Sequence, residues 1–418
     1  MDLDYERRAW TAIYCALALV EGGAAAVMVR ALFAGQAPAL VVDLVLAMVS
    51  SAPMWANLAS LAYARRAQGR PKVAFLQPIL FAMCLAIAAL ALVPVTATGL
   101  LLFFLLHASA RLLWSGVETV RAVLWTVNYP SRMRARATGL ITINTSIVLA
   151  VTSLGMGALL GLSQPWWRAA ILAGAALGFA GAVAFRRVRV RREEQLLEQE
   201  RVRVEQGARF GLAGMRELLA RDPAFRDYQV AMSVFGAGML SMTPLMIICQ
   251  NEVLHLPAFW QVLVTTAIPV VVVPFAIRPW AAYLDTHRVL AFRAVHGRYT
   301  VAASALLLTA VFLRQPWLLV PGAGLLGVSY AAGSLGWTLG HNDFAPRGEE
   351  TRYMALHVTM TGIRGLVTPP LAIGLYYLLE SLQSGAGPAA LALPFALIVA
   401  GARRFARMHR DRRAAAPG

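Results

Sequence analysis

The chain has 418 residues, of which 59% are hydrophobic and only 14% are charged, and its mean hydropathy is +0.61. A water-soluble domain carries about 25% charged residues, so this composition excludes an ordinary soluble protein. The formal net charge is +17, but the basic residues are spread between apolar stretches along the chain, which argues against a nucleic-acid-binding surface.

Twelve apolar stretches follow one another, each long enough for a helix to cross a bilayer core of about 30 Å. Because lipid offers no partner to backbone N–H and C=O groups, such stretches are expected to be helices. The expected spans are 10–33, 38–63, 73–94, 97–125, 137–161, 166–185, 228–250, 258–283, 289–313, 316–340, 352–379 and 386–402. The sequence therefore predicts an all-α membrane protein with two six-helix bundles, 1–185 and 228–418, joined by a connector at 186–227.

Most basic residues fall in connections on one side of the predicted membrane. Three basic residues, Arg30, Arg168 and Arg314, are expected on the other side. Because Lys and Arg are enriched in cytoplasmic loops, both termini and the connector are expected in the cytoplasm, at the inner or plasma membrane of a prokaryote. His287 and His296 would then be cytoplasmic and solvated.

The connector between the two bundles is dense in arginine. Two short runs in it, 192–198 and 214–219, carry mixed charges at helical spacing, which is typical of an amphipathic segment at a membrane surface. A partner-binding role is one interpretation of this connector, and a solvated tether is the favoured one.

The two halves of the chain share a sequence pattern. The motif Pro-x5-Arg-x2-small opens the fifth span at Pro130 and the eleventh span at Pro346. A basic turn at 65–72 follows the second span, and a counterpart at 285–288 follows the eighth. Matches that occur in the same order in both halves indicate a duplicated six-helix unit.

With these features the chain resembles the major facilitator superfamily of transporters over nearly its whole length. The superfamily's turn after span 2 reads Gly-x-x-x-Asp-Arg-x-Gly-Arg-Arg/Lys. Here Gly69 and Arg70 keep its final Gly-Arg, whereas Arg66 and Ala67 stand at the expected Asp and Arg. The resemblance implies a secondary active transporter, not an enzyme, whose halves rock about a central site to move a small organic solute by alternating access.

Charged side chains inside the spans are the first candidates for function, because placing one at a helix centre costs about 2.5–3.5 kcal/mol. Glu21 lies half-way along span 1 and Arg111 in the middle of span 4. Both are expected to face a central cavity, where Arg111 binds an anionic group or holds a carboxylate whose protonation drives the cycle. The alternative is a structural ion pair between the two spans. Glu118 and Arg121 are three residues apart and can pair locally, for which a structural role is favoured.

Arg364 in span 11 has no acid within four residues, so its partner must lie on another helix or on the substrate. Pro369 and Pro370 follow it and remove two backbone donors, which predicts a kink. The kink is either a gating hinge or a bend that serves packing.

Asp285 lies at the C-terminal end of span 8, where the helix dipole disfavours an anion. We expect it to contact Arg136 or the start of span 5 and to latch the bundles when the cytoplasmic side is closed. The resemblance implies the same role for its turn motif. Gly69, Arg70 and Arg352 are therefore further gating candidates.

Two other functions stay open, a lipid or amphiphile flippase and a transporter-like sensor or assembly subunit. No metal or cofactor is expected, because Cys15, Cys84 and Cys249 lie inside spans without metal-ligand spacing. The expected partners are a small-molecule substrate, protons and the lipid bilayer, with no nucleic acid, and the expected oligomeric state is a monomer.

Overall fold

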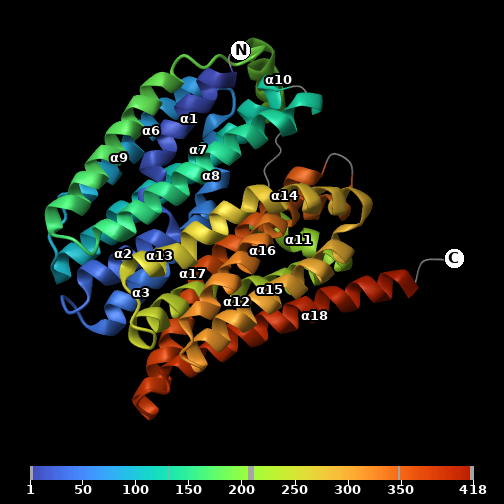
Figure 1. Ribbon diagram of the computed structural model, residues 1–418. Coiled ribbons are helices and arrows are strands. Elements are labelled where there is room, and N and C mark those ends of the chain that lie inside the picture. The colour runs from blue at the N-terminus through green and yellow to red at the C-terminus, as the bar shows by residue number, and fades with distance from the viewer. Residues whose placement is uncertain (1–2, 130, 206–210, 347–348, 415–418) are drawn as a thin grey trace.

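The computed structural model describes residues 3–129, 131–205, 211–346 and 349–414. Within these ranges ten helices are long and apolar enough to cross a membrane, and two bent helix pairs bring the total to twelve if each pair is one span. The predicted all-α, twelve-span architecture is confirmed, and the helices gather into two bundles (Figure 1).

The N-terminal bundle begins with two interrupted spans. Span 1 consists of α1 (Leu3–Leu17), η1 (Ala18–Val20) and α2 (Gly22–Phe33), and span 2 of α3 (Ala39–Ser50), α4 (Ala52–Trp55), η2 (Ala56–Ala59) and α5 (Ser60–Ala67). Spans 3 to 6 are α6 (Lys72–Leu90), α7 (Ala97–Asn128), α8 (Ser131–Leu159) and α9 (Gln164–Phe185).

The C-terminal bundle follows the two connector helices α10 (Glu193–Glu205) and α11 (Leu212–Arg221). Span 7 is α12 (Pro223–Glu252), and span 8 is α13 (Ala258–Val262), the π-helical η3 (Leu263–Ala267) and α14 (Ile268–Thr286). Spans 9 to 12 are α15 (Val289–Phe312), then η4 (Pro316–Leu318), α16 (Leu319–Leu339) and η5 (Gly340–Asp343), then α17 (Glu350–Leu382), and finally η6 (Gly387–Leu391) with α18 (Ala392–Ala414).

The packing inside the two bundles follows one scheme. In the N-terminal bundle α1 packs against α8 and α9, and α6 packs against α7 and α9. The equivalent helices of the C-terminal bundle do the same, since α12 packs against α17 and α18, and α15 packs against α16 and α18. The structure thus supports the duplication that the sequence predicts.

The breaks in the first two spans were not predicted. Span 1 bends by 43° at Glu21, whose backbone is extended (φ −71, ψ 134), and span 2 bends by 52° at Ser51. Gly22 and Gly23 follow the first break and Pro53 the second, and these residue types weaken or end a helix. The predicted kink at Pro369 and Pro370 does not interrupt the helix, because α17 continues as one helix through both residues.

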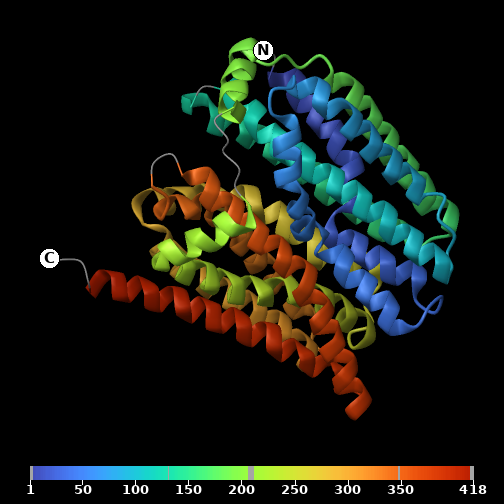
Figure 2. The same cartoon turned by 180° about the vertical axis from the view of Figure 1, so that it is seen from behind.

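The bundles meet mainly at one end of the molecule. We call the face that carries Leu3, α10, α11 and the end of α18 the terminal face, and the other the distal face. The main inter-bundle contacts join α2 and α3 to α12, the broken span 2 to α17, and α8 to α13, η3 and α14. Figures 1 and 2 show the bundles close together at α2, α3 and α13 and diverging toward α10 and α11. This conformation is therefore closed at the distal face.

Each connector helix docks on a bundle through some of its side chains and exposes others. The Glu200 carboxylate on α10 accepts hydrogen bonds from the Gly69 N–H (2.7 Å) and from Lys72 Nζ (2.5 Å). Met215 and Leu218 on α11 are buried in the core of the C-terminal bundle. The connector is thus more than a solvated tether, because the buried ammonium of Lys72 needs an acid and α11 has an apolar side to cover.

Candidate functional site

Glu21 and Arg111 form an ion pair at the break of span 1. Arg111 Nη1 lies 3.2 Å from Glu21 Oε2, although the two residues come from spans 1 and 4. The Arg111 side chain is 4% exposed and that of Glu21 27%, so the carboxylate is the reachable partner of the pair. The structure brings together the two residues that the sequence placed half-way across the membrane.

The break exposes backbone groups that side chains of neighbouring helices satisfy. His107 on α7 contacts the Val20 carbonyl through Nε2 at 3.1 Å, and Ser153 on α8 donates to the Ala18 carbonyl at 3.4 Å. A Cβ atom on Gly23 would lie 2.5 Å from Thr266 Oγ1 in the π-helical segment of span 8. The break is thus held by the N-terminal bundle and touches the C-terminal bundle.

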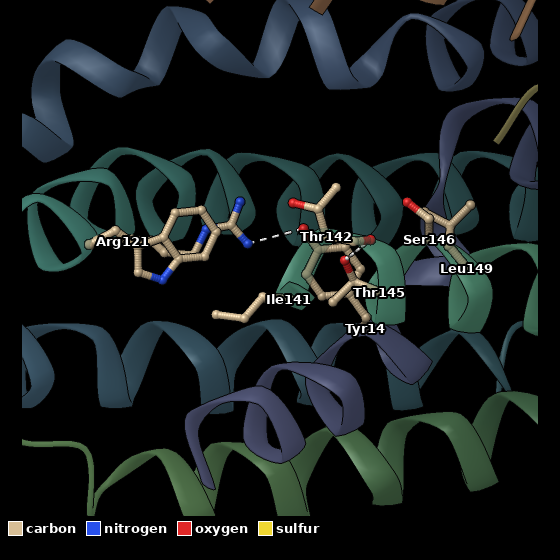
Figure 3. A pocket seen from close by; sticks show the side chains of 8 residues that line it. Tyr14, Arg121, Ile141, Thr142, Thr145, Ser146 and Leu149 are labelled. Carbon is tan, nitrogen blue, oxygen red and sulfur yellow. Dashed lines mark hydrogen bonds between the residues drawn. The ribbon is translucent and has the colours of Figure 1, made fainter. Parts of the chain in front are cut away.

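Arg121 lies near the terminal end of α7 among aromatic rings. Its guanidinium donates to the Tyr14 hydroxyl at 3.0 Å and stacks 4.5 Å from the ring centre of Trp125. Figure 3 shows Arg121 with the residues that line a cavity of about 160 Å³, namely Tyr14, Trp125, Ile141, Thr142, Thr145, Ser146 and Leu149. The expected local ion pair with Glu118 is not among the contacts of the described chain.

Arg364 lies inside the C-terminal bundle. It is 7% exposed, and its Nη2 donates to Thr361 Oγ1 at 2.7 Å. The glycines beside it pack against the broken span 2, since a Cβ on Gly365 would lie 2.9 Å from that of Met54. The Arg364 side chain itself packs against Gly236 of its own bundle, so it lies next to the contact with the other bundle and not in it.

A polar network on the distal face ties the two bundles together. Arg30 on α2 pairs with Asp43 on α3 (2.5 Å) and with Glu252 on α12. Tyr377 on α17 donates to the other Asp43 oxygen at 2.7 Å, and Arg30 also contacts Asn251 (3.3 Å). Asp43 is only 1% exposed, so these contacts neutralise a buried carboxylate at the closed end.

The structure describes only some of the predicted gating residues on the terminal face. Asp285 is exposed and takes part in none of the ion pairs found in the described ranges. The side chain of Arg136, and Pro130 itself, lie outside the described residues. Gly69 adopts φ +67, which brings its N–H to Glu200. Glu200 thus supplies an acid near the place where Arg66 replaces the superfamily's Asp.

Comparisons with known proteins decide the family. A sequence model of the Major Facilitator Superfamily matches residues 13–369. The chain belongs to the Major Facilitator Superfamily. It is a multi-pass membrane protein of a transporter family and not an enzyme.

Solved structures of the superfamily share the fold at low sequence identity. The nucleoside transporter NupG has a TM-score of 0.72 at 11% identity, with 97% of this chain and 100% of that chain covered. A D-xylose–proton symporter has a TM-score of 0.71 at 12% identity, with 96% of each chain covered. The POT family transporter PepTSo has a TM-score of 0.71 at 11% identity, with 99% and 98% covered. No curated protein matches the chain.

Some features of this superfamily member escaped the sequence reasoning. His296, expected to be solvated, is 2% exposed and contacts Ser329 Oγ at 3.1 Å, because it lies two turns inside α15. Arg293, one turn before it, is equally buried. The distal network could have been predicted from the sequence, since Arg30, Asp43 and Glu252 carry complementary charges at the ends of three spans. Within the described ranges no His, Cys, Asp and Glu side chains gather in a way that could hold a metal ion.

Proposed function

We propose that this protein is a secondary active transporter that moves a small organic solute across a prokaryotic cell membrane by alternating access, with protons as the coupling ion. The ion pair between Glu21 and Arg111 at the break of span 1 is the observation that carries this proposal. An ionisable residue inside a membrane span is costly, so its presence at a helix break favours a functional role.

Protonation of Glu21 would change the contacts of the break. An ionised Glu21 neutralises the buried Arg111, whereas a protonated Glu21 leaves the guanidinium without an anion. The extended backbone at Glu21 joins α1 to α2, and α2 is the segment that packs against α12, α13 and η3. Proton uptake at this point would therefore bias the orientation of α2, and with it the closure of the distal face.

Two latches would alternate during the cycle. The network of Arg30, Asp43, Glu252 and Tyr377 holds the distal face closed in the present conformation. We propose that Asp285 meets Arg136 when the terminal face closes instead. The terminal face would be cytoplasmic, because the basic connector lies on it.

Uptake by purified protein in liposomes, with and without an imposed pH gradient, tests the function. We expect the gradient to drive accumulation of at least one solute from a metabolite pool. Glu21→Gln should abolish the effect of the gradient and keep exchange of the solute down its own gradient, while the control Glu194→Gln in the connector behaves like the wild type. Gradient-driven accumulation that survives Glu21→Gln refutes coupling through this residue.

The same assay separates the open alternatives. A flippase would move labelled lipid between leaflets and leave soluble metabolites where they are. A sensor or assembly subunit would move neither.

A further inference from the structure

The C-terminal bundle contains two buried arginines without an acidic partner. Arg293 on α15 is 2% exposed and Arg364 on α17 is 7% exposed. In the described chain the other Lys and Arg side chains that are this deeply buried are Arg30, Lys72 and Arg111, and each of them pairs with a carboxylate. Neither Arg293 nor Arg364 does so among the described residues.

Neutral groups satisfy only part of the two guanidinium groups. Arg293 contacts the Tyr228 hydroxyl through Nε (3.4 Å) and His296 Nδ1 through Nη1 (3.3 Å). Arg364 donates to Thr361 through Nη2. Arg293 Nη2 and Arg364 Nε and Nη1 are buried without a hydrogen-bond partner. These nitrogens are donors that no described atom of the protein accepts from.

Both arginines pack against α12, and Arg293 also packs against α16. A Cβ on Gly236 of α12 would lie 3.1 Å from the Arg364 guanidinium carbon, and a Cβ on Gly336 of α16 would lie 2.7 Å from that of Arg293. Trp337, the next residue on α16, donates through its indole nitrogen to Thr361 Oγ1 at 3.3 Å. The same Thr361 oxygen accepts from Arg364. Arg293 and Arg364 are thus linked through neighbouring residues of α12, α16 and α17. Glycine at both contact points leaves room for the side chains.

Two like charges with unused donors in a desolvated site are unfavourable unless an anion joins them. The two bundles differ here, because the N-terminal bundle neutralises Arg111 with its own Glu21. We propose that Arg293 and Arg364 bind an oxyanion group, a carboxylate or a phosphate, of the transported solute. The planar fork of arginine matches either group, and each bond to it is charge-assisted.

The location of Arg364 fits a site that the transport cycle opens. The inference rests on the proposed function: α17 packs against the broken span 2, and rocking of the bundles would separate these helices one residue away from Arg364. The Tyr228 hydroxyl, which accepts from Arg293, would donate its hydrogen to the anion.

Thermal unfolding of the purified full-length protein in nanodiscs of neutral phosphatidylcholine tests the site. We expect inorganic phosphate or acetate to raise the unfolding midpoint above that in chloride at equal ionic strength. Arg293→Gln and Arg364→Gln should each weaken the apparent affinity about 10- to 100-fold, the usual effect of losing hydrogen bonds to a charged group. Arg278→Gln removes an exposed arginine of span 8 and should leave the affinity unchanged.

Arg293→Lys and Arg364→Lys keep the charge and lose the fork, so they should bind more weakly than wild type but more tightly than the glutamine variants. They also supply the test if a glutamine variant does not fold. Absence of any anion effect on the wild type, or an equal loss in Arg278→Gln, overturns the proposal. So does stabilisation by phosphatidylglycerol nanodiscs alone that Arg364→Gln removes, since the site would then hold a lipid headgroup.

Uptake assays distinguish a failure of this site from a failure of transport. Accumulation of a neutral or cationic solute, with no anion effect on the wild type, refutes the anion site and leaves the transport function standing. Anion binding through both arginines without movement of any solute supports the site and refutes transport.

Discussion

Tyr377→Phe removes one hydrogen bond between the bundles and changes almost nothing else. The Tyr377 hydroxyl donates to the Asp43 carboxylate at 2.7 Å, and Asp43 is 1% exposed. A hydrogen bond to a charged group contributes about 1.5–3 kcal/mol. When the distal face opens, water can replace this bond, so its loss penalises only the closed state. The ratio of distal-open to distal-closed molecules should therefore rise about 10- to 100-fold.

Spin labels at Gln36 and Ser384 can measure this ratio. Both residues are exposed in connections of the distal face, one in each bundle. In a variant whose native cysteines are replaced by serine, electron–electron distance measurements should show a larger long-distance population for Tyr377→Phe. The control is Tyr376→Phe, because the neighbouring hydroxyl makes no hydrogen bond to the described part of the other bundle. An unchanged distance distribution, or an equal shift in the control, would refute a latch at Asp43.

Three further predictions concern the terminal face and the topology. Glu200→Gln should loosen α10, since breaking a buried ion pair costs about 3–5 kcal/mol. Amide hydrogen exchange in this helix should then accelerate about 100-fold or more. The control Glu198→Gln, at an exposed position of the same helix, should change the exchange rate little. Asp285→Asn should slow solute uptake if this residue latches the terminal face, and wild-type uptake would remove the basis of that latch. A cysteine at Ser384 should react with a membrane-impermeant reagent from outside the cell, and labelling from the cytoplasm alone would invert the topology.

The sequence by itself determined the number of spans, the two bundles and their duplication. These properties depend on the length and hydropathy of each segment. Both can be read from consecutive residues, because every lipid-embedded segment must satisfy its backbone hydrogen bonds within itself. The charged residues Glu21 and Arg111 were found in the same way, because a charge inside an apolar stretch is visible without knowing its partner.

Only the tertiary structure decided how the charges pair. Arg111 meets an acid 90 residues away, Lys72 one 128 residues away, and Arg30 one 222 residues away. Such pairs depend on how each helix is rotated and how the bundles are tilted, which hydropathy does not record. The uncompensated charges of Arg293 and Arg364 are visible for the same reason only in three dimensions, where their neighbours prove to be hydroxyl groups, imidazoles and glycines.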